Sequence, residues 1–257
     1  MNIELDRIYN MDCLEGMKAI PDGSVDAVIC DLPYGVLNRS NPDAQWDSVI
    51  PLDKLWEQYK RICKPTAVVV LFGQGMFTAD LMQSNRKWWR YNIVWDKVRT
   101  TGFLNANRMP LRCHEDIVVF YDQLPTYNPQ MEKCPPHLRN HSRGPRKDDH
   151  TNRCYGTFKD AEPFMADEKY PRSILTHPNI VQSNWHPTQK PVDLLRYLVL
   201  TYTNEGDTVL DNCMGSGTTA IACIKERRHF IGFELNKEYF DKACKRIDNE
   251  RRQLTLF

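Results

Sequence analysis

Residues 25–35, VDAVICDLPYG, give the strongest indication of the fold. Its first six residues are nearly all apolar, which predicts a strand that is covered on both faces of a sheet. Pro33 ends the strand because it has no N–H to donate, and it restricts Leu32 to extended backbone angles. By itself the motif would suit an ordinary turn. It would also place a carboxylate (Asp31), a carbonyl (Leu32) and a ring (Tyr34) where open α/β sheets bind ligands.

The bulk composition limits the class of protein. The chain has 257 residues, of which 41% are hydrophobic and 26% charged, enough for one large α/β domain with or without an inserted lobe. The net charge of +1 means that any basic surface must be local. Nine cysteines without a C-x-x-C pair favour a reducing cytoplasm over a disulfide framework. We find neither an apolar run of membrane-spanning length nor a signal peptide.

Strand-like runs alternate with amphipathic helical patterns along most of the chain. We predict strands at 7–10, 25–30, 67–72, 91–95, 117–121, 208–211 and 230–233. We predict helices at 13–20, 52–63, 76–86, 192–203, 220–227 and 237–251. This alternation predicts an α/β fold with a doubly wound, mostly parallel sheet.

Residues 122–185 break this pattern, because the periodicity fades and Pro, Asn, His, Arg and Lys dominate. The stretch is too long for a plain connection, so we expect a functional insertion, an extra lobe or a partly disordered segment. Basic residues among aromatic ones suit a polyanion, although each residue singly also suits a solvated loop. The DNA-binding candidates are Lys133, Arg139, Arg143, Arg146 and Lys147. Zinc ligands could be Cys134, His137, His141 and Cys154, but their irregular spacing in a polar loop leads us to expect no metal.

A second polar turn follows the predicted strand at 208–211. Residues 215–220, GSGTTA, fit the G-x-G-x-x-G/A pattern for nucleotide binding, and Glu234 follows the next strand. The glycines would let a cofactor approach the backbone, and the carboxylate can hold two ribose hydroxyls. Asp211 is close enough in sequence to touch the same ligand. These residues leave two cofactors open, a nicotinamide dinucleotide and S-adenosylmethionine.

Four segments together resemble the motifs of the β group of DNA amino-methyltransferases. DLPYG at 31–35 is similar to the Asp-Pro-Pro-Tyr motif of that family, and NCMGSG at 212–217 to its cofactor loop. FELN at 233–236 is similar to the ribose-binding strand end, and HPTQKP at 186–191 to the segment before the cofactor loop. The order of catalytic loop, variable region and cofactor half is that of the β group. The resemblance covers the whole chain except the variable region.

The resemblance implies a permuted, seven-stranded, Rossmann-like methyltransferase sheet with an inserted target-recognition region. The strand at 208–211 would be central, with 230–233 and then 7–10 on one side. On the other side would lie 25–30, 67–72 and the pair of 91–95 and 117–121, the last of these antiparallel. The catalytic half would span 1–121, the target-recognition region 122–185, and the cofactor-binding half of the same domain 186–257.

The resemblance also implies an S-adenosyl-L-methionine-dependent enzyme that acts on a base flipped out of double-stranded DNA. Its catalytic residues would be Asp31, Leu32, Pro33 and Tyr34. The Asp31 carboxylate and the Leu32 carbonyl would accept the N–H groups of the target amine, and Tyr34 would stack on the base. The amine would attack the methyl group in line, without a covalent enzyme intermediate. Leu32 stands where the commonest family motif has Pro.

The implied cofactor site is spread along the whole chain. Asp12, after the first strand, matches the acid that contacts the adenine of the cofactor. The full cofactor-binding set would be Asp12, His186, Thr188, Lys190, Asp211, Asn212, Gly215, Gly217, Thr218 and Glu234. The implied partners are a short specific site in DNA, a second copy of the chain and a cognate restriction endonuclease.

The target base and the reaction class leave alternatives. An Asp at position 31 favours adenine N6, whereas cytosine-N4 enzymes more often begin this motif with Ser, so cytosine N4 stays open. Cytosine-C5 chemistry needs a Pro-Cys pair, which the chain lacks. An NAD-dependent oxidoreductase would leave the segments 31–35 and 186–191 unexplained. A protein-glutamine methyltransferase would have the reverse motif order, and a catalytically inactive DNA-binding module would not need the retained Asp31.

Overall fold

The computed structural model describes residues 3–36, 47–134, 151–152, 156–157, 167–179 and 189–254. The chain forms two compact units. The larger comprises Met1–Asn128 and Ser173–Phe257, and the smaller comprises Pro129–Arg172. Among the described helices, none is both long and apolar enough to cross a membrane.

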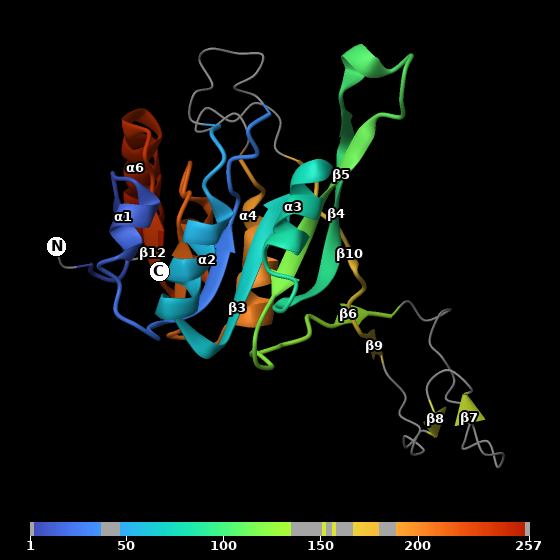
Figure 1. The fold of residues 1–257 in the computed structure, drawn as a ribbon, viewed down its shortest axis with the longest axis horizontal. Coiled ribbons are helices and arrows are strands. Elements are labelled where there is room, and N and C mark those ends of the chain that lie inside the picture. Colours follow the sequence, from blue (N-terminus) through green and yellow to red (C-terminus); the bar gives the residue numbers. More distant parts are fainter. Residues whose placement is uncertain are drawn as a thin grey trace. The chain divides into compact units, whose positions relative to one another are not determined.

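The larger unit is built on an eight-stranded sheet with the order β1-β12-β11-β2-β3-β5-β4-β10 (Figure 1). Within this sheet, β5 is antiparallel to both of its neighbours, and the other adjacent strands are parallel. The α/β class and the mostly parallel sheet were therefore predicted correctly. The strands are β1 (Arg7–Tyr9), β2 (Val25–Cys30), β3 (Cys63–Gly73), β4 (Trp89–Thr101), β5 (Arg112–Phe120), β10 (Ile174–Thr176), β11 (Thr208–Asp211) and β12 (His229–Phe233).

The prediction of seven strands was wrong, because β10 adds an eighth strand beside β4. Residues Ile174–Thr176 pair in parallel with Val94–Asp96. Leu175 is buried in the core of the sheet, while its two neighbours in the strand are exposed. A three-residue strand with one buried side chain carries too little periodicity to be recognised in sequence.

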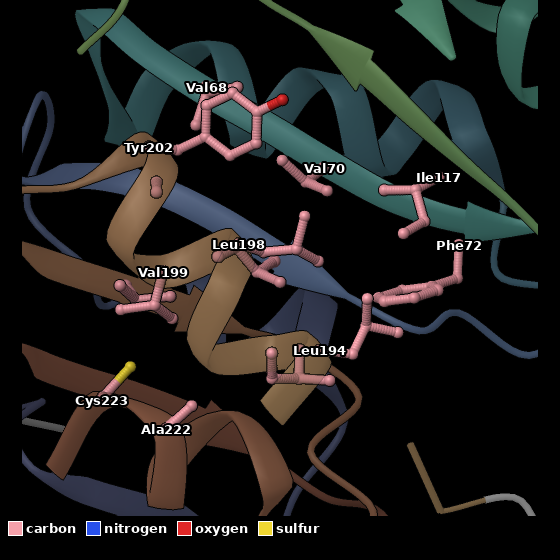
Figure 2. Close-up of a cluster of buried hydrophobic side chains, with 14 of the residues drawn as sticks. Val68, Val70, Phe72, Ile117, Leu194, Leu198, Val199, Tyr202, Ala222 and Cys223 are labelled. Carbon is pink, nitrogen blue, oxygen red and sulfur yellow. The ribbon is translucent and has the colours of Figure 1, made fainter. Parts of the chain in front are cut away.

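Helices cover the two faces of the sheet. The helices are α1 (Cys13–Met17), α2 (Leu52–Ile62), α3 (Met76–Ser84), α4 (Val192–Tyr202), α5 (Thr218–Lys225) and α6 (Lys237–Leu254). Ala27 and Ile29 of β2 pack with α4 and α5, whereas Val28 and Cys30 pack with α1, α2 and α3. Figure 2 shows the first of these clusters, in which Val70 of β3 lies near Leu198 of α4. This alternation follows from the two-residue period of a strand.

A hairpin formed by β4 and β5 extends beyond the body of the sheet (Figure 1). Asp96 pairs with His114 and Thr101 with Arg112, so residues 97–100 face only Cys113 on the opposite strand. A bulge of this kind redirects side chains. Val98 within it has a φ of 63°, which is an outlier for a β-branched residue.

The described residues of the smaller unit form two short antiparallel ladders. They join β6 (Glu132–Lys133) to β9 (Glu168–Lys169) and β7 (Thr151–Asn152) to β8 (Gly156–Thr157).

Candidate active site

The loop that follows β2 begins at the carboxyl edge of the sheet, where the parallel strands end. β2 lies between β11 and β3, and Asp31 is the first residue after it. The Leu32 side chain is only 3% exposed and packs in the core on the α1–α3 face. The backbone at the position where the family commonly has Pro is therefore held by burial of a side chain.

Asp47 anchors the same loop. Its Oδ1 accepts hydrogen bonds from the amides of Tyr34 (2.8 Å) and Gly35 (3.1 Å), and its Oδ2 accepts one from Val36 (2.8 Å). Gly35 allows this turn with a φ of +69°, and a Cβ there would lie 2.6 Å from Cγ2 of Val49. Asp47 was not predicted as a site residue, because an Asp in a polar stretch resembles any solvated carboxylate.

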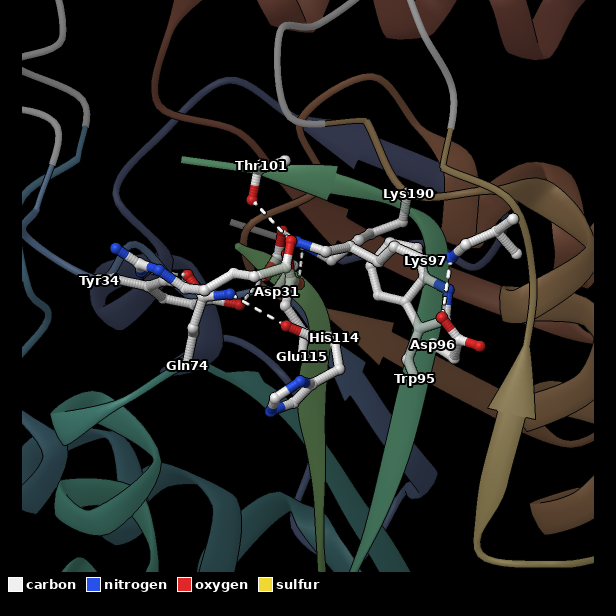
Figure 3. Close-up of polar contacts among 12 residues, drawn as sticks. Asp31, Tyr34, Gln74, Trp95, Asp96, Lys97, Thr101, His114, Glu115 and Lys190 are labelled. Carbon is white, nitrogen blue, oxygen red and sulfur yellow. Dashed lines mark hydrogen bonds and ion pairs between the residues drawn. The ribbon is translucent and has the colours of Figure 1, made fainter. Parts of the chain in front are cut away.

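Two predicted residues contact Asp31 directly (Figure 3). The Tyr34 hydroxyl donates to Oδ1 over 2.9 Å, and Nζ of Lys190 donates to Oδ2 over 2.5 Å. The Tyr34 ring stacks on Phe77, with 4.9 Å between centroids. The structure thus joins the catalytic candidates Asp31 and Tyr34 with Lys190, which the resemblance assigned to the cofactor.

Lys190 is part of a longer row of buried charges. Its Nζ lies 3.2 Å from Oε2 of Glu115, and Nζ of Lys97 donates to Oε1 of Glu115 over 3.0 Å. We call the row Asp31–Lys190–Glu115–Lys97 the four-charge chain. Its side chains are 26%, 10%, 13% and 4% exposed, in that order. Two anions and two cations alternate, so the burial of each charge is compensated by a neighbour.

Glu115 and Lys97 were not predicted as site residues. Both come from the base of the β4–β5 hairpin, and the bulge turns Lys97 inward while Val98 is exposed. Lys190 also lies over the ring of Phe72, 5.1 Å from its centroid. No signal in the sequence indicates these contacts, because they depend on which strands are neighbours.

The electrostatics differ along the four-charge chain. Burial raises the pKa of the Asp31 carboxyl, although Lys190 pulls it down. At Glu115 burial also favours the neutral form, but Lys190 and Lys97 outweigh it and lower the pKa of that carboxyl. Burial opposes the charge on Lys190, yet the two carboxylates raise the pKa of its ammonium. Of the two carboxylates, Asp31 is therefore the one whose surroundings raise its pKa.

The glycine-rich loop after β11 begins with the carboxylate of Asp211. Asp211 is buried; its Oδ2 accepts from the Thr219 hydroxyl over 2.6 Å and its Oδ1 from the Cys213 amide over 3.0 Å. Burial raises the pKa of Asp211 to about 6. Gly217 has a φ of +79°, which a residue with a side chain would rarely adopt.

Three further members of the predicted cofactor site, Glu234, Asn212 and Asp12, lie in the described part of the chain. Glu234 accepts hydrogen bonds from the amides of Gly215 and Asn236, each over 2.8 Å, and burial raises the pKa of its carboxyl. Asn212 is buried and accepts from the Tyr59 hydroxyl. Asp12 caps α1 by accepting from the amides of Leu14 and Glu15.

Arg246 of α6 was not predicted as a site residue. Its Nη1 donates to the carbonyl oxygen of Ser216 and to Oγ1 of Thr218, each over 3.0 Å. This arginine fixes the second half of the glycine-rich loop from outside. It could not be told apart by sequence from the other basic residues of the same helix.

Some predicted residues lie outside the described part of the chain. These are the cofactor candidates His186 and Thr188 and the DNA-binding candidates Arg139, Arg143, Arg146 and Lys147. Lys133 is exposed on β6 of the smaller unit. Of the zinc candidates, only Cys134 is described, and His137, His141 and Cys154 are not.

Solved structures support the same fold. The complex of M1.HpyAVI with SAM has a TM-score of 0.62 and 25% sequence identity, covering 94% of this chain and 98% of that one. The cytosine-N4-specific PvuII DNA methyltransferase has a TM-score of 0.67 at 15% identity, covering 98% of this chain and 93% of that one. At such an identity the second likeness concerns the fold alone.

Two characterised relatives match nearly the whole chain. The type II methyltransferase M.HinfI of Haemophilus influenzae is 28% identical over 274 residues, covering 96% of this chain and 69% of the relative. M.BglII of Bacillus subtilis is 28% identical over 268 residues, covering 96% of this chain and 70% of the relative. The family model described as DNA methylase, for N6 and N4 methylation, matches residues 25–245. The chain therefore belongs to the N6/N4 DNA methylase family, together with type II restriction-modification methyltransferases.

Proposed function

We propose that the protein transfers a methyl group from S-adenosyl-L-methionine to the exocyclic N6 of adenine in double-stranded DNA. The half-buried Asp31 carboxylate at the carboxyl end of β2 carries this proposal, because an Asp at the start of the motif favours adenine. Cytosine N4 is the second candidate, since its amine would use the same carboxylate and carbonyl. Family membership removes the reason to consider an NAD-dependent oxidoreductase.

The proposed chemistry follows from the two acceptors of the loop. The lone pair of an exocyclic amine is delocalised into the base. Hydrogen bonds from its N–H groups to the Asp31 carboxylate and the Leu32 carbonyl would localise that pair toward the methyl donor. Tyr34 and Lys190 hold the carboxylate, and the buried Leu32 side chain holds the carbonyl. Asp31 would then be the nearest base for the extra proton of the methylated amine.

S-Adenosyl-L-methionine supplies an electrophilic methyl group, whose bond to sulfur breaks as the bond to nitrogen forms. The residues present fit such a group. Glu234 uses two acceptor positions on backbone amides, and a carboxylate has about four, so it retains capacity for ribose hydroxyls. Asp12, Asn212, Gly215 and Gly217 would form the rest of the site with His186 and Thr188, while Asp211 and Thr218 would shape the loop.

The stretch 122–185, which contains the smaller unit, would be the target-recognition region. Lys133 and the predicted basic residues that follow it would contact phosphates. A second copy of the chain and a restriction endonuclease of the same specificity are the further expected partners.

Methyl transfer to unmethylated bacterial DNA, followed by nucleoside digestion and mass analysis, tests the reaction. We expect N6-methyladenine with the unaltered protein and none with Asp31→Ala. Asp53→Ala, which removes an exposed carboxylate of α2, is the matched control and should keep full activity.

Other products would change the proposal in defined ways. N4-methylcytosine would keep the catalytic loop and correct the base. If cofactor binding is demonstrated by calorimetry but DNA of varied sequence gains no methyl group, the proposed substrate is wrong.

A further inference from the structure

The tip of the β4–β5 hairpin is an exposed apolar surface that the catalytic site does not use. We define the hairpin tip as residues 98–112, which include a short 3-10 helix at Phe103–Asn105. Phe103 is 80% exposed and Leu104 is 95% exposed. Val98, Met109 and Leu111 are exposed as well. Exposed apolar side chains gathered on one projecting element mark an interaction site.

The charge of the hairpin tip selects the kind of partner. Arg99, Arg108 and Arg112 are all exposed, and residues 98–113 contain neither Asp nor Glu. Arg112 donates to the Gln74 side chain over 2.9 Å, and within the described residues no carboxylate forms an ion pair with any of the three arginines. A second copy of the chain would bring like charges together on this surface, whereas a polyanion complements them.

The hairpin tip is also joined to the catalytic site. Lys97 and Glu115 at the base of the hairpin belong to the four-charge chain that ends at Asp31. Arg112 is three residues from Glu115, and Phe103 is two residues beyond the Thr101–Arg112 pair. These five residue steps, at the rise of about 3.4 Å per residue in a strand, place Phe103 roughly 17 Å along the hairpin from Glu115. A duplex that presents a base to Asp31 would pass beside it.

We propose that the hairpin tip docks on DNA beside the target base. The arginines contact phosphates, and Phe103 and Leu104 enter the base stack next to the flipped nucleotide, as apolar wedges do in other DNA-binding proteins. This inference rests on the proposed function, which supplies DNA as the substrate. It adds a contact surface outside the predicted region 122–185 and links that surface to the charges around Asp31.

The arginines are tested by the salt dependence of DNA binding. We expect Arg99→Gln and Arg108→Gln each to reduce the slope of log Kd against log salt by about 1. Lys60→Gln, which removes an exposed cation from the last turn of α2, should leave the slope unchanged. Unchanged slopes in both arginine variants would overturn the phosphate contacts.

The wedge is tested with matched and mismatched target sites. We expect the double variant Phe103→Ala, Leu104→Ala to lose about tenfold in single-turnover methylation of a paired target. It should lose much less when the target base is mismatched, because a mismatched base costs less to unpair. Leu124→Ala, which truncates a similarly exposed leucine beyond the other end of β5, is the control. Equal losses on both substrates would overturn the wedge.

Three further outcomes separate this inference from the proposed function. If the unaltered protein methylates DNA while all hairpin variants bind and methylate DNA normally, only the hairpin inference fails. If light scattering shows that the double variant converts a dimer into a monomer with unchanged DNA binding, the hairpin tip is a self-association surface and the inference also fails. If the unaltered protein binds DNA but transfers no methyl group, the proposed function fails, and the salt slopes still decide the arginine contacts.

Discussion

The glycine-rich loop and the four-charge chain belong to one unit of the protein but are held in opposite ways. In the loop, Asp211 bonds to residues two and eight positions along the chain. In the four-charge chain, Lys190 is 159 positions from Asp31. The loop combines these local hydrogen bonds with contacts from Glu234 and Arg246, which lie 19 and 30 positions from their partners, whereas the four charges meet only because of the order of the strands. The first should tolerate changes elsewhere in the fold better than the second.

Lys190→Ala should give the largest effect, because it leaves two buried carboxylates without their shared cation. We expect a loss of about 3–5 kcal/mol in the free energy of unfolding and at least a hundredfold loss of single-turnover methyl transfer. Urea denaturation and rapid-quench methylation measure the two effects.

Lys18→Ala is the control for that variant, since it removes a lysine from an exposed ion pair with Glu15. It should cost less than about 1 kcal/mol. A similar cost for both variants would show that the four-charge chain is not a buried network in solution.

Asp211→Asn tests whether the carboxyl of Asp211 in the glycine-rich loop makes the stability of the protein depend on pH. The pKa of Asp211 is raised from 3.8 to about 6, so its contribution to stability is fully present below about pH 3.8 and is lost as the pH rises through 6. The loss is about 3 kcal/mol at most. The variant, which never carries this charge, should lack this loss between pH 4 and 7 in urea denaturation. Parallel stability profiles for the two proteins would contradict the buried-carboxylate interpretation.

Asp47→Ala removes one carboxylate that three backbone amides share, at residues 34–36. We expect a cost of about 2 kcal/mol in unfolding free energy. The rate of methyl transfer should fall about tenfold, because the loop that positions Asp31 loosens, while cofactor affinity measured by calorimetry should not change. Asp47→Asn, which keeps an oxygen acceptor, should recover part of the rate. A loss of cofactor affinity equal to the loss of rate would refute a role confined to the catalytic loop.

Alanine substitutions at three glycines should lower the free energy of unfolding least, by amounts that increase from one glycine to the next. Gly23, Gly217 and Gly35 all have positive φ, but the space around them differs. A Cβ added at Gly23 would have no neighbour within 4 Å. A Cβ added at Gly217 would lie 3.3 Å from the Cβ of Ala243, and one added at Gly35 would lie 2.6 Å from Cγ2 of Val49. Alanine at Gly23 should cost about 1 kcal/mol from backbone strain alone. The cost measured by urea denaturation should rise through Gly217→Ala to Gly35→Ala. Equal costs would show that contacts around the two loops relax freely.

The sequence by itself determined the α/β class, the alternation of buried side chains and the two polar turns. Hydrophobic periodicity indicates which residues of a strand or helix are buried, and the residues of each turn are contiguous in the chain. The secondary structure and the two turns can therefore be predicted without a structure. The eighth strand could not be predicted from the sequence, because three residues with one buried side chain, Leu175, are too few to show hydrophobic periodicity.

Tertiary structure alone decided what surrounds Asp31. Asp47, Lys97 and Glu115 come from a polar loop and from two neighbouring strands, and each resembles an ordinary surface charge in the sequence. The bulge at 97–100 turns Lys97 inward, and the placement of β5 beside β3 and β4 sets Glu115 next to Lys190. Periodicity tells which face of a strand is buried, but the charges that meet across a sheet depend on strand order and register, which no local pattern encodes.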